Sequence, residues 1–173
     1  MKKIFLIFFL LFQSNFGILF ANTNIVFIDM EKVISTSKPG LSIILQLKQI
    51  NKKNIKVFKI QKNELKLKED KIVSQKNIIS EKEFQNRIAE LKIEVNKYNK
   101  NRKEIIKTFN NLKINNTKKF LNLINPILST YSKDKSISFI LQKKNLIIGK
   151  TELDITSEII MIINKDIKEF KIK

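Results

Sequence analysis

The sequence contains no cysteine and no histidine. Their absence excludes disulfide bonds, thiol nucleophiles, imidazole bases and the common zinc sites, all of which need one of these two residue types. Most classes of enzyme depend on such groups. We therefore predict a protein that is not an enzyme and that uses no metal or other cofactor.

Acidic residues are also few, with 16 Asp and Glu against 34 Lys and Arg, which gives a net charge of +18. Arginine is scarcer still, because Arg87 and Arg102 are the only two. Hydrophobic residues make up 43% of the 173 residues, an ordinary share for a folded chain of one or two domains. An A+T-rich coding sequence would by itself account for part of the Lys excess.

The N-terminus carries the pattern of an export signal. Two lysines precede an apolar stretch over residues 4–12, which is short for a membrane span, and a second apolar stretch ends at Ala21. This order predicts a signal peptide over residues 1–21, cleavage after Ala21 and export to the periplasm. An uncleaved anchor is the alternative, since Leu19 stands where a small residue is preferred. Cleavage would leave a net charge of +16.

Glycine and proline are nearly absent, with three Gly and two Pro in the whole chain. After Pro39 and Gly40, 85 residues follow without either type, and they are rich in Lys, Glu, Leu and Ile. Such a composition predicts long helices, which proline and glycine would interrupt. A single helix of that length does not suit a globular protein, so a turn is expected at residues 75–79.

Ser80 and Glu83 have the spacing of a capping box, in which each side chain accepts a hydrogen bond from the other residue's amide. A new helix should therefore start after Ser80. We predict two helices, over residues 41–73 and 81–130, that form an antiparallel hairpin. Pro126 is expected to kink or end the second helix.

The second predicted helix carries the clearest periodicity in the chain. Nine positions alternate in spacing between four and three residues, and eight of them are apolar, which is a heptad seam for packing against another helix. The facing register of the first helix is apolar at only four of six positions. The seam positions of the second helix are Phe84, Ile88, Leu91, Val95, Tyr98, Arg102, Ile105, Phe109 and Leu112, and those of the first are Ile55, Phe58, Lys62, Leu65, Glu69 and Ile72.

Strand-like patterns flank the helical region. Residues 24–30 are β-branched and aromatic and predict one short strand, while residues 137–141 and 146–148 predict a β-hairpin, which together would make a three-stranded sheet. Asp154 or Thr156 is expected to cap a last amphipathic helix that continues to Phe170. A sheet this small leaves edges and an apolar face that need covering, so association of the bodies is one expectation.

The order of these elements resembles the Skp/OmpH family of periplasmic chaperones. The resemblance covers essentially the whole chain after the predicted signal peptide, although the arm is poor in Gln and Ala and its tip lacks Gly. The segments that carry it are Ile25 to Asp29, the break at Pro39-Gly40, the long basic hairpin, Ser80 with its acidic followers, and Asp154-Ile155-Thr156 before the last helix.

The resemblance implies a predominantly helical α+β fold, in which a long antiparallel helical hairpin (the arm) stands on a small β-sheet body. One protomer would span residues 22–173, with the body at 24–45 and 121–173, the arm at 46–120 and the tip near 74–80. Family members are homotrimers of jellyfish-like architecture, whose arms enclose a cavity. The implied function is a periplasmic, ATP-independent holdase that binds unfolded outer-membrane proteins and prevents their aggregation during outer-membrane assembly.

The basic arm is the main candidate for partner binding. Between residues 48 and 119, 19 Lys and two Arg stand against eight acidic residues, a net charge of +13. A basic wall would attract acidic clients, anionic lipid or lipopolysaccharide by long-range steering. Lysine on long helices is equally typical of a solvated face. The candidate client-contacting residues are Phe58, Lys59, Lys62, Lys66, Arg87, Lys92, Arg102 and Lys103.

Two other functions compete with the chaperone. A basic patch also suits a nucleic-acid-binding, histone-like protein. The predicted export signal argues against nucleic acid as a partner, as do the shortage of Arg for contacts with base edges and the lack of an aromatic motif for single strands. The other alternative is a structural coiled-coil protein of the envelope, held by an uncleaved N-terminal anchor.

Overall fold

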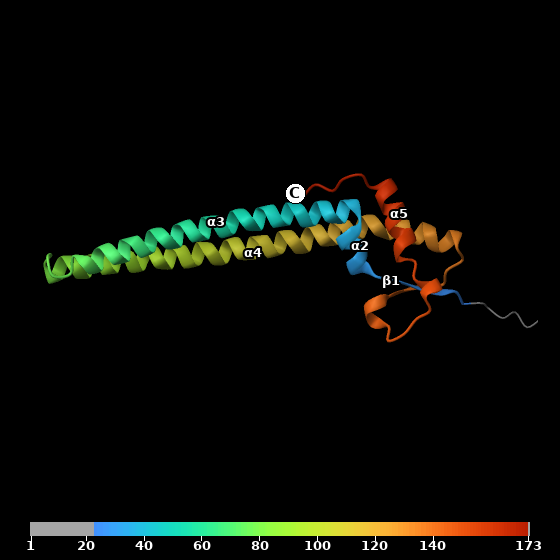
Figure 1. Cartoon of the computed structure of the whole chain (residues 1–173), viewed down its shortest axis with the longest axis horizontal. Coiled ribbons are helices and arrows are strands. Elements are labelled where there is room, and N and C mark those ends of the chain that lie inside the picture. Colours follow the sequence, from blue (N-terminus) through green and yellow to red (C-terminus); the bar gives the residue numbers. More distant parts are fainter. Residues whose placement is uncertain (1–22, 173) are drawn as a thin grey trace, which may run out of the picture.

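The computed structural model describes residues 23–172, so the predicted signal peptide and its cleavage site lie outside the described residues. Helices α3 (Lys38–Ser74) and α4 (Glu81–Asp134) form a long antiparallel hairpin, the arm, and the other elements gather at one end of it as the body (Figure 1). The body contains β1 (Ile25–Ile28), α2 (Met30–Thr36), β2 (Phe139–Gln142), the 3-10 helices η2 (Lys143–Asn145) and η3 (Thr151–Leu153), and α5 (Thr156–Asp166). The predominantly helical fold with a long hairpin is confirmed.

Helix α3 begins earlier than predicted, at Lys38 instead of residue 41. Pro39 is compatible with this start because a proline in the first turn of a helix loses no intrahelical hydrogen bond. Ser37 Oγ caps the helix by accepting a hydrogen bond from the Gly40 N–H at 3.3 Å. A Cβ atom at Gly40 would lie 2.1 Å from the carbonyl oxygen of Ile34, so only glycine allows α2 and α3 to pass this closely.

The turn at the tip of the arm lies at residues 75–80, where it was predicted. Ser80 Oγ accepts a hydrogen bond from the Glu83 N–H at 3.2 Å, which is one half of the predicted capping box. The Glu83 carboxylate is used differently, because it accepts from Arg87 Nε at 2.9 Å. Arg87 also donates to Gln75 Oε1 at 2.6 Å, so this side chain ties the two sides of the turn together.

Helix α4 continues through Pro126 to Asp134, so of the two predicted outcomes, a kink or an end at the proline, the end is wrong. Pro126 is exposed, and water can satisfy a carbonyl that loses its amide partner on that side of the helix. Ile124 and Tyr131, one on each side of the proline, are both buried in the body. Their packing holds the last two turns in register and outweighs the local cost of the proline.

The sheet differs from the prediction in both size and direction. β1 pairs with β2 in parallel, with Ile25 opposite Phe139 and Ile28 opposite Gln142, and the described residues contain no other strand. The predicted hairpin and the three-stranded sheet are therefore wrong. The polar break after β2 forms η2 instead of a turn, and residues 146–148 are not a strand. Two parallel strands need a long crossover, and here α2, α3 and α4 supply it.

Helix α5 is positioned by a small polar cluster at its start. The Asp29 N–H donates to Thr156 Oγ1 at 2.9 Å, and the Thr156 N–H donates to Asp154 Oδ1 at 3.0 Å. Burial alone would raise the pKa of Asp154, but the hydrogen bonds from Thr156 and Lys143 outweigh it and hold this pKa below its usual value. Asp154 thus caps the first amide of α5 as predicted, although the N-cap position itself is held by Ile155 and not by Asp154 or Thr156.

Helix α5 ends at Asp166, so residues 167–170, which were predicted to continue it, leave the helix. The core of the molecule lies at the root of the arm, where α3 and α4 meet the body. There the Tyr131 hydroxyl donates to the Glu158 carboxylate, and burial together with this bond raises the pKa of Tyr131 to about 12. The buried apolar cluster consists of Val26, Ile28, Val33, Ile43, Leu47, Phe120, Ile124, Tyr131, Ile155, Ile159, Ile163 and Phe170.

Candidate functional site on the helical arm

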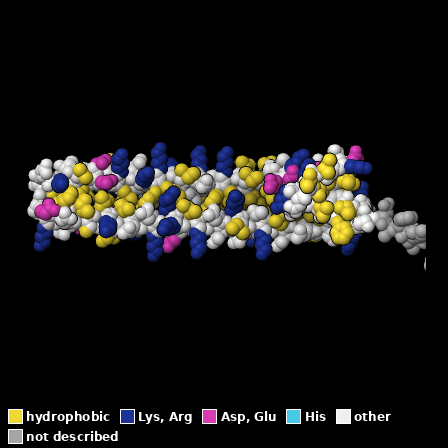
Figure 2. Space-filling model, turned by 90° about the horizontal axis from the view of Figure 1, so that it is seen from below, with side chains coloured by type: hydrophobic (Ala, Val, Ile, Leu, Met, Phe, Trp, Pro, Cys, Tyr) yellow, Lys and Arg dark blue, Asp and Glu magenta, His cyan; other side chains and the backbone are white. Residues whose placement is uncertain are grey.

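The arm beyond its root has no closed core. Between residues 48 and 115, all of which are described, no side chain is fully buried, and the predicted seam residues are at best half-buried. Two helices alone cannot enclose the apolar residues between them, since each helix covers only one side of the other. Figure 2 shows apolar side chains running along the arm between projecting basic side chains. The arm therefore offers an apolar surface with a basic border.

Many large apolar side chains on the arm are exposed outright. Exposed apolar side chains mark a surface that can bind other molecules where they form a contiguous patch, and Figure 2 shows such a band along one face of the arm. Leu67, Ile78 and Ile93 retain 68%, 79% and 68% of their possible exposure, so most of each residue is open to solvent. The other exposed residues of the set are Ile55, Val57, Ile60, Val73, Ile106 and Ile114.

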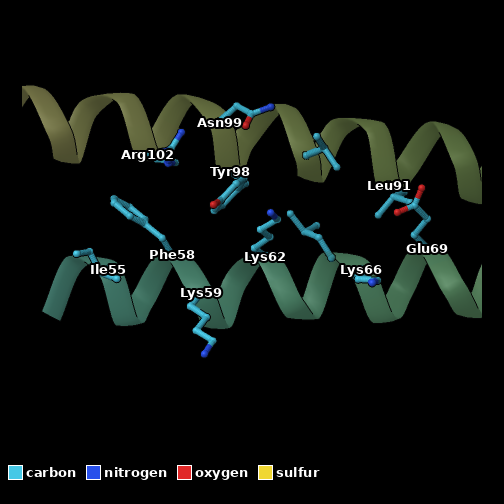
Figure 3. Close-up of a pocket in the computed structure, with 12 residues that line it drawn as sticks. Ile55, Phe58, Lys59, Lys62, Lys66, Glu69, Leu91, Tyr98, Asn99 and Arg102 are labelled. Carbon is cyan, nitrogen blue, oxygen red and sulfur yellow. The ribbon is translucent and has the colours of Figure 1, made fainter. Parts of the chain in front are cut away.

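A groove opens between α3 and α4 near the middle of the arm, with a volume of about 870 Å³ (Figure 3). We call it the mid-arm groove. Phe58 from α3 and Tyr98 from α4 extend into the space between the helices, and the Arg102 guanidinium lies 5.7 Å from the centre of the Phe58 ring. Its lining residues are Ile55, Phe58, Lys59, Lys62, Leu65, Lys66, Glu69, Leu91, Val95, Tyr98, Asn99 and Arg102.

The mid-arm groove exists because the seam of α3 is interrupted. Lys62 and Glu69 occupy seam positions of α3, where α4 presents apolar residues such as Leu91 and Val95. A charged side chain cannot fill such a position without losing its hydration, so it leaves space that a Leu would close. Four basic side chains and one acidic side chain line the groove, which makes its surroundings positive. It can therefore hold apolar groups that carry negative charge nearby.

A second, smaller groove of about 400 Å³ opens between the same two helices. It is crossed by an ion pair between Lys68 Nζ and the Glu94 carboxylate at 2.5 Å. Leu65 and Tyr98 line both grooves, so only a thin layer of side chains separates them. The two helices are therefore not closed against each other at this level of the arm.

The eight predicted contact residues fall into three groups. Phe58, Lys59, Lys62, Lys66 and Arg102 line the mid-arm groove, although Lys59 points away from α4 (Figure 3). Lys92 and Lys103 are exposed on α4 and line neither groove. Arg87 belongs to the tip, where its hydrogen bonds to Glu83 and Gln75 give it a structural role.

The prediction missed most of the α4 side of the groove. Leu91, Val95 and Tyr98 were assigned to the heptad seam between the helices, yet they line an open space. The signal that could have found them was present in the sequence, because the α3 register was already polar at Lys62 and Glu69. An apolar seam facing two charged residues cannot be closed, so the apolar side should have been treated as accessible.

Within residues 23–172, no three acidic side chains are placed to hold a metal ion. No helix in that range combines the length and the apolar composition needed to cross a bilayer.

Comparison with known proteins agrees with this architecture. Residues 24–163 match the family described as outer membrane protein (OmpH-like). The fold is similar to the crystal structure of a protein from Caulobacter crescentus CB15 assigned as an OmpH-like outer membrane chaperone. The TM-score is 0.72 at 15% sequence identity, covering 87% of this chain and 89% of that chain. No curated protein matches the chain significantly. Because the family match spans the arm and most of the body, the chain belongs to the OmpH-like outer membrane protein family.

Proposed function

We propose that the chain is a periplasmic, ATP-independent holdase chaperone that binds unfolded outer-membrane proteins and prevents their aggregation. The observation that carries this proposal is the open, basic-bordered apolar surface of the arm, centred on the mid-arm groove. Membership of the OmpH-like family supports it. The predicted signal peptide at residues 1–21 would deliver the chain to the periplasm.

The mechanism follows from the weakness of each contact. An unfolded chain can place apolar side chains on Phe58 and Tyr98 while its acidic residues lie near Lys62, Lys66 and Arg102. Each such contact is exposed to water and is easily lost and remade, but many contacts along the arm hold the client together. The client stays bound yet mobile, and its release needs no chemical step. Anionic lipid or lipopolysaccharide would be attracted by the same charges.

Association into a homotrimer would give the arms a shared cavity. The body has apolar residues that its own core does not cover: Phe139 retains 60% of its possible exposure, and Ile147 and Ile148 are almost fully exposed. Ile25 and Leu141 on the two strands are also exposed. A second and third copy of the body would cover these residues, as the predicted association of bodies requires.

The test compares two activities of purified residues 22–173 at about 0.15 M salt, where nonspecific contacts with DNA are already weakened. We expect the protein to suppress light scattering by an unfolded β-barrel protein as that protein is diluted from denaturant. Binding to duplex DNA, followed by fluorescence anisotropy, should be weak at the same concentrations. Tight DNA binding without any effect on aggregation would favour the histone-like alternative and reject the chaperone.

A further inference from the structure

The segment after α5 runs back from the body to α3 as an extended chain (Figure 1). It covers residues 167–172, which belong to neither a helix nor the sheet. Its position was not predicted, because its apolar residues were assigned to the preceding helix. The segment is nevertheless held by specific contacts with the root of the arm.

Gln46 on α3 makes two hydrogen bonds to the main chain of this segment. Its Nε2 donates to the carbonyl oxygen of Phe170 at 2.7 Å, and its Oε1 accepts from the Ile172 N–H at 3.1 Å. In an extended chain, the carbonyl of one residue and the amide of the second residue beyond it point to the same side. The Gln46 side-chain amide can therefore make both hydrogen bonds at once, in the way that the edge of a neighbouring β-strand would.

Ser42 adds further hydrogen bonds at the same place on α3. Its hydroxyl donates to the same carbonyl of Phe170 at 3.0 Å. It also accepts from Gln46 Nε2 at 3.0 Å, one turn further along α3. The Phe170 carbonyl thus has two donors from α3, and the Gln46 amide is fixed in the orientation that the extended segment needs.

The Phe170 side chain makes the apolar contact between the segment and the arm. Its ring packs edge-on against Phe120 of α4, with ring centres 6.2 Å apart and planes at 89°. Phe120 is fully buried and Phe170 is 8% exposed, so the tail residue is part of the core. The segment therefore touches both helices of the arm at the level where their last fully buried residues lie.

We propose that Ser42, Gln46 and Phe120 form a docking site for an extended peptide with an aromatic residue, that the chain fills this site with its own residues 167–172, and that release of this segment loosens the root of the arm. The site recognises the main chain through Gln46 and Ser42 and one aromatic side chain through Phe120. Because the arm has no fully buried side chain between residues 48 and 115, the contacts at the root determine how firmly α3 is held against α4. This role of the segment does not depend on what the arm binds.

The first test supplies the segment as a separate peptide. A chain that stops after Asp166 should bind a fluorescent peptide of residues 167–173 in a saturable way, while the full chain, whose site is occupied, should not. The same peptide with Phe170→Ala keeps its charge and should bind about tenfold more weakly or worse, because the aromatic anchor is lost. Equal binding of the two peptides, or no binding to a folded truncated chain, would overturn the proposal.

The second test keeps the full chain, so that it remains informative if the truncated chain does not fold. Gln46→Ala removes both main-chain hydrogen bonds, whereas Gln49→Ala changes an exposed residue of the same type in the next turn of α3. We expect amide hydrogen exchange in residues 42–50 and 112–120 to become about tenfold faster in Gln46→Ala and to stay unchanged in Gln49→Ala. Unchanged exchange in both variants would show that the segment does not hold the root.

Discussion

Phe120→Ala is expected to lower the free energy of unfolding of the body by about 3–5 kcal/mol, a large part of the stability of a small domain. Phe120 is fully buried at the junction of the arm and the body and packs against Phe170. Removing its ring leaves a cavity in the buried apolar cluster, whose residues come from several elements and cannot all move to fill it. The tail also loses its aromatic partner.

Tyrosine fluorescence during urea unfolding measures the free energy of unfolding of the body. The chain has no Trp and two Tyr, so a Tyr98→Phe background leaves Tyr131 in the body as the single reporter. Phe84→Ala near the tip is the control, because Phe84 is only half-buried and has Lys76 over its ring at 5.9 Å. The control should cost about 1 kcal/mol or less, as is usual for a partly exposed residue. Equal losses would mean that the core is not confined to the root.

Reversing three charges of the mid-arm groove is expected to slow client association about tenfold or more at low salt, since focused charge accelerates association by that order. The variant carries Lys59→Glu, Lys62→Glu and Lys66→Glu. An acidic unfolded client would then approach a repulsive instead of an attractive groove. The difference should shrink as salt rises, because the screening length falls from about 10 Å at 0.1 M to about 3 Å at 1 M.

A control variant with the same change in net charge distinguishes an effect of the charges at the mid-arm groove from an effect of the total charge of the arm. Lys107→Glu, Lys113→Glu and Lys118→Glu alter exposed lysines of α4 that line neither groove. Stopped-flow measurement of client binding should show a clearly smaller effect for this triple variant. If both triple variants slow association equally, only the total charge of the arm matters and the groove has no special role.

The arm could be predicted because its signals are local. The absence of Gly and Pro over 85 residues, the heptad spacing on α4 and the cap at Ser80 each depend on residues close together in the sequence. Helix periodicity and capping act within a few turns, so they can be recognised without knowledge of the fold. The position of the tip followed from the same signals.

The body could not be predicted as well, because its contacts join distant segments. β1 pairs with β2 across more than a hundred residues, and nothing near residue 139 indicates a parallel partner at residue 25. Residues 146–148 have the composition of a strand but lie exposed outside the sheet. Residues 167–170 have helical periodicity, yet the hydrogen bonds of Gln46 and the packing of Phe120 favour an extended conformation.

The candidate site was half predictable. Five of the eight proposed contact residues line the mid-arm groove. Four of them lie on α3, whose heptad pattern is interrupted, and the fifth is Arg102, the one polar seam position of α4. The groove itself depends on how two charged seam positions are accommodated, which is a matter of packing between helices. That packing also placed Arg87 in the tip and left Lys92 and Lys103 outside the groove.

Photo-crosslinking from the mid-arm groove tests most directly the claim that unfolded clients bind in this groove. A photoreactive phenylalanine at position 58 would report contacts inside the mid-arm groove, and the same group at position 103 would report contacts on an exposed part of α4 outside it. With an unfolded β-barrel protein present, we predict strong crosslinks from position 58, weak ones from position 103, and loss of the former when the client is folded. Equal crosslinking from both positions, or none from position 58 while aggregation is still suppressed, would contradict the account.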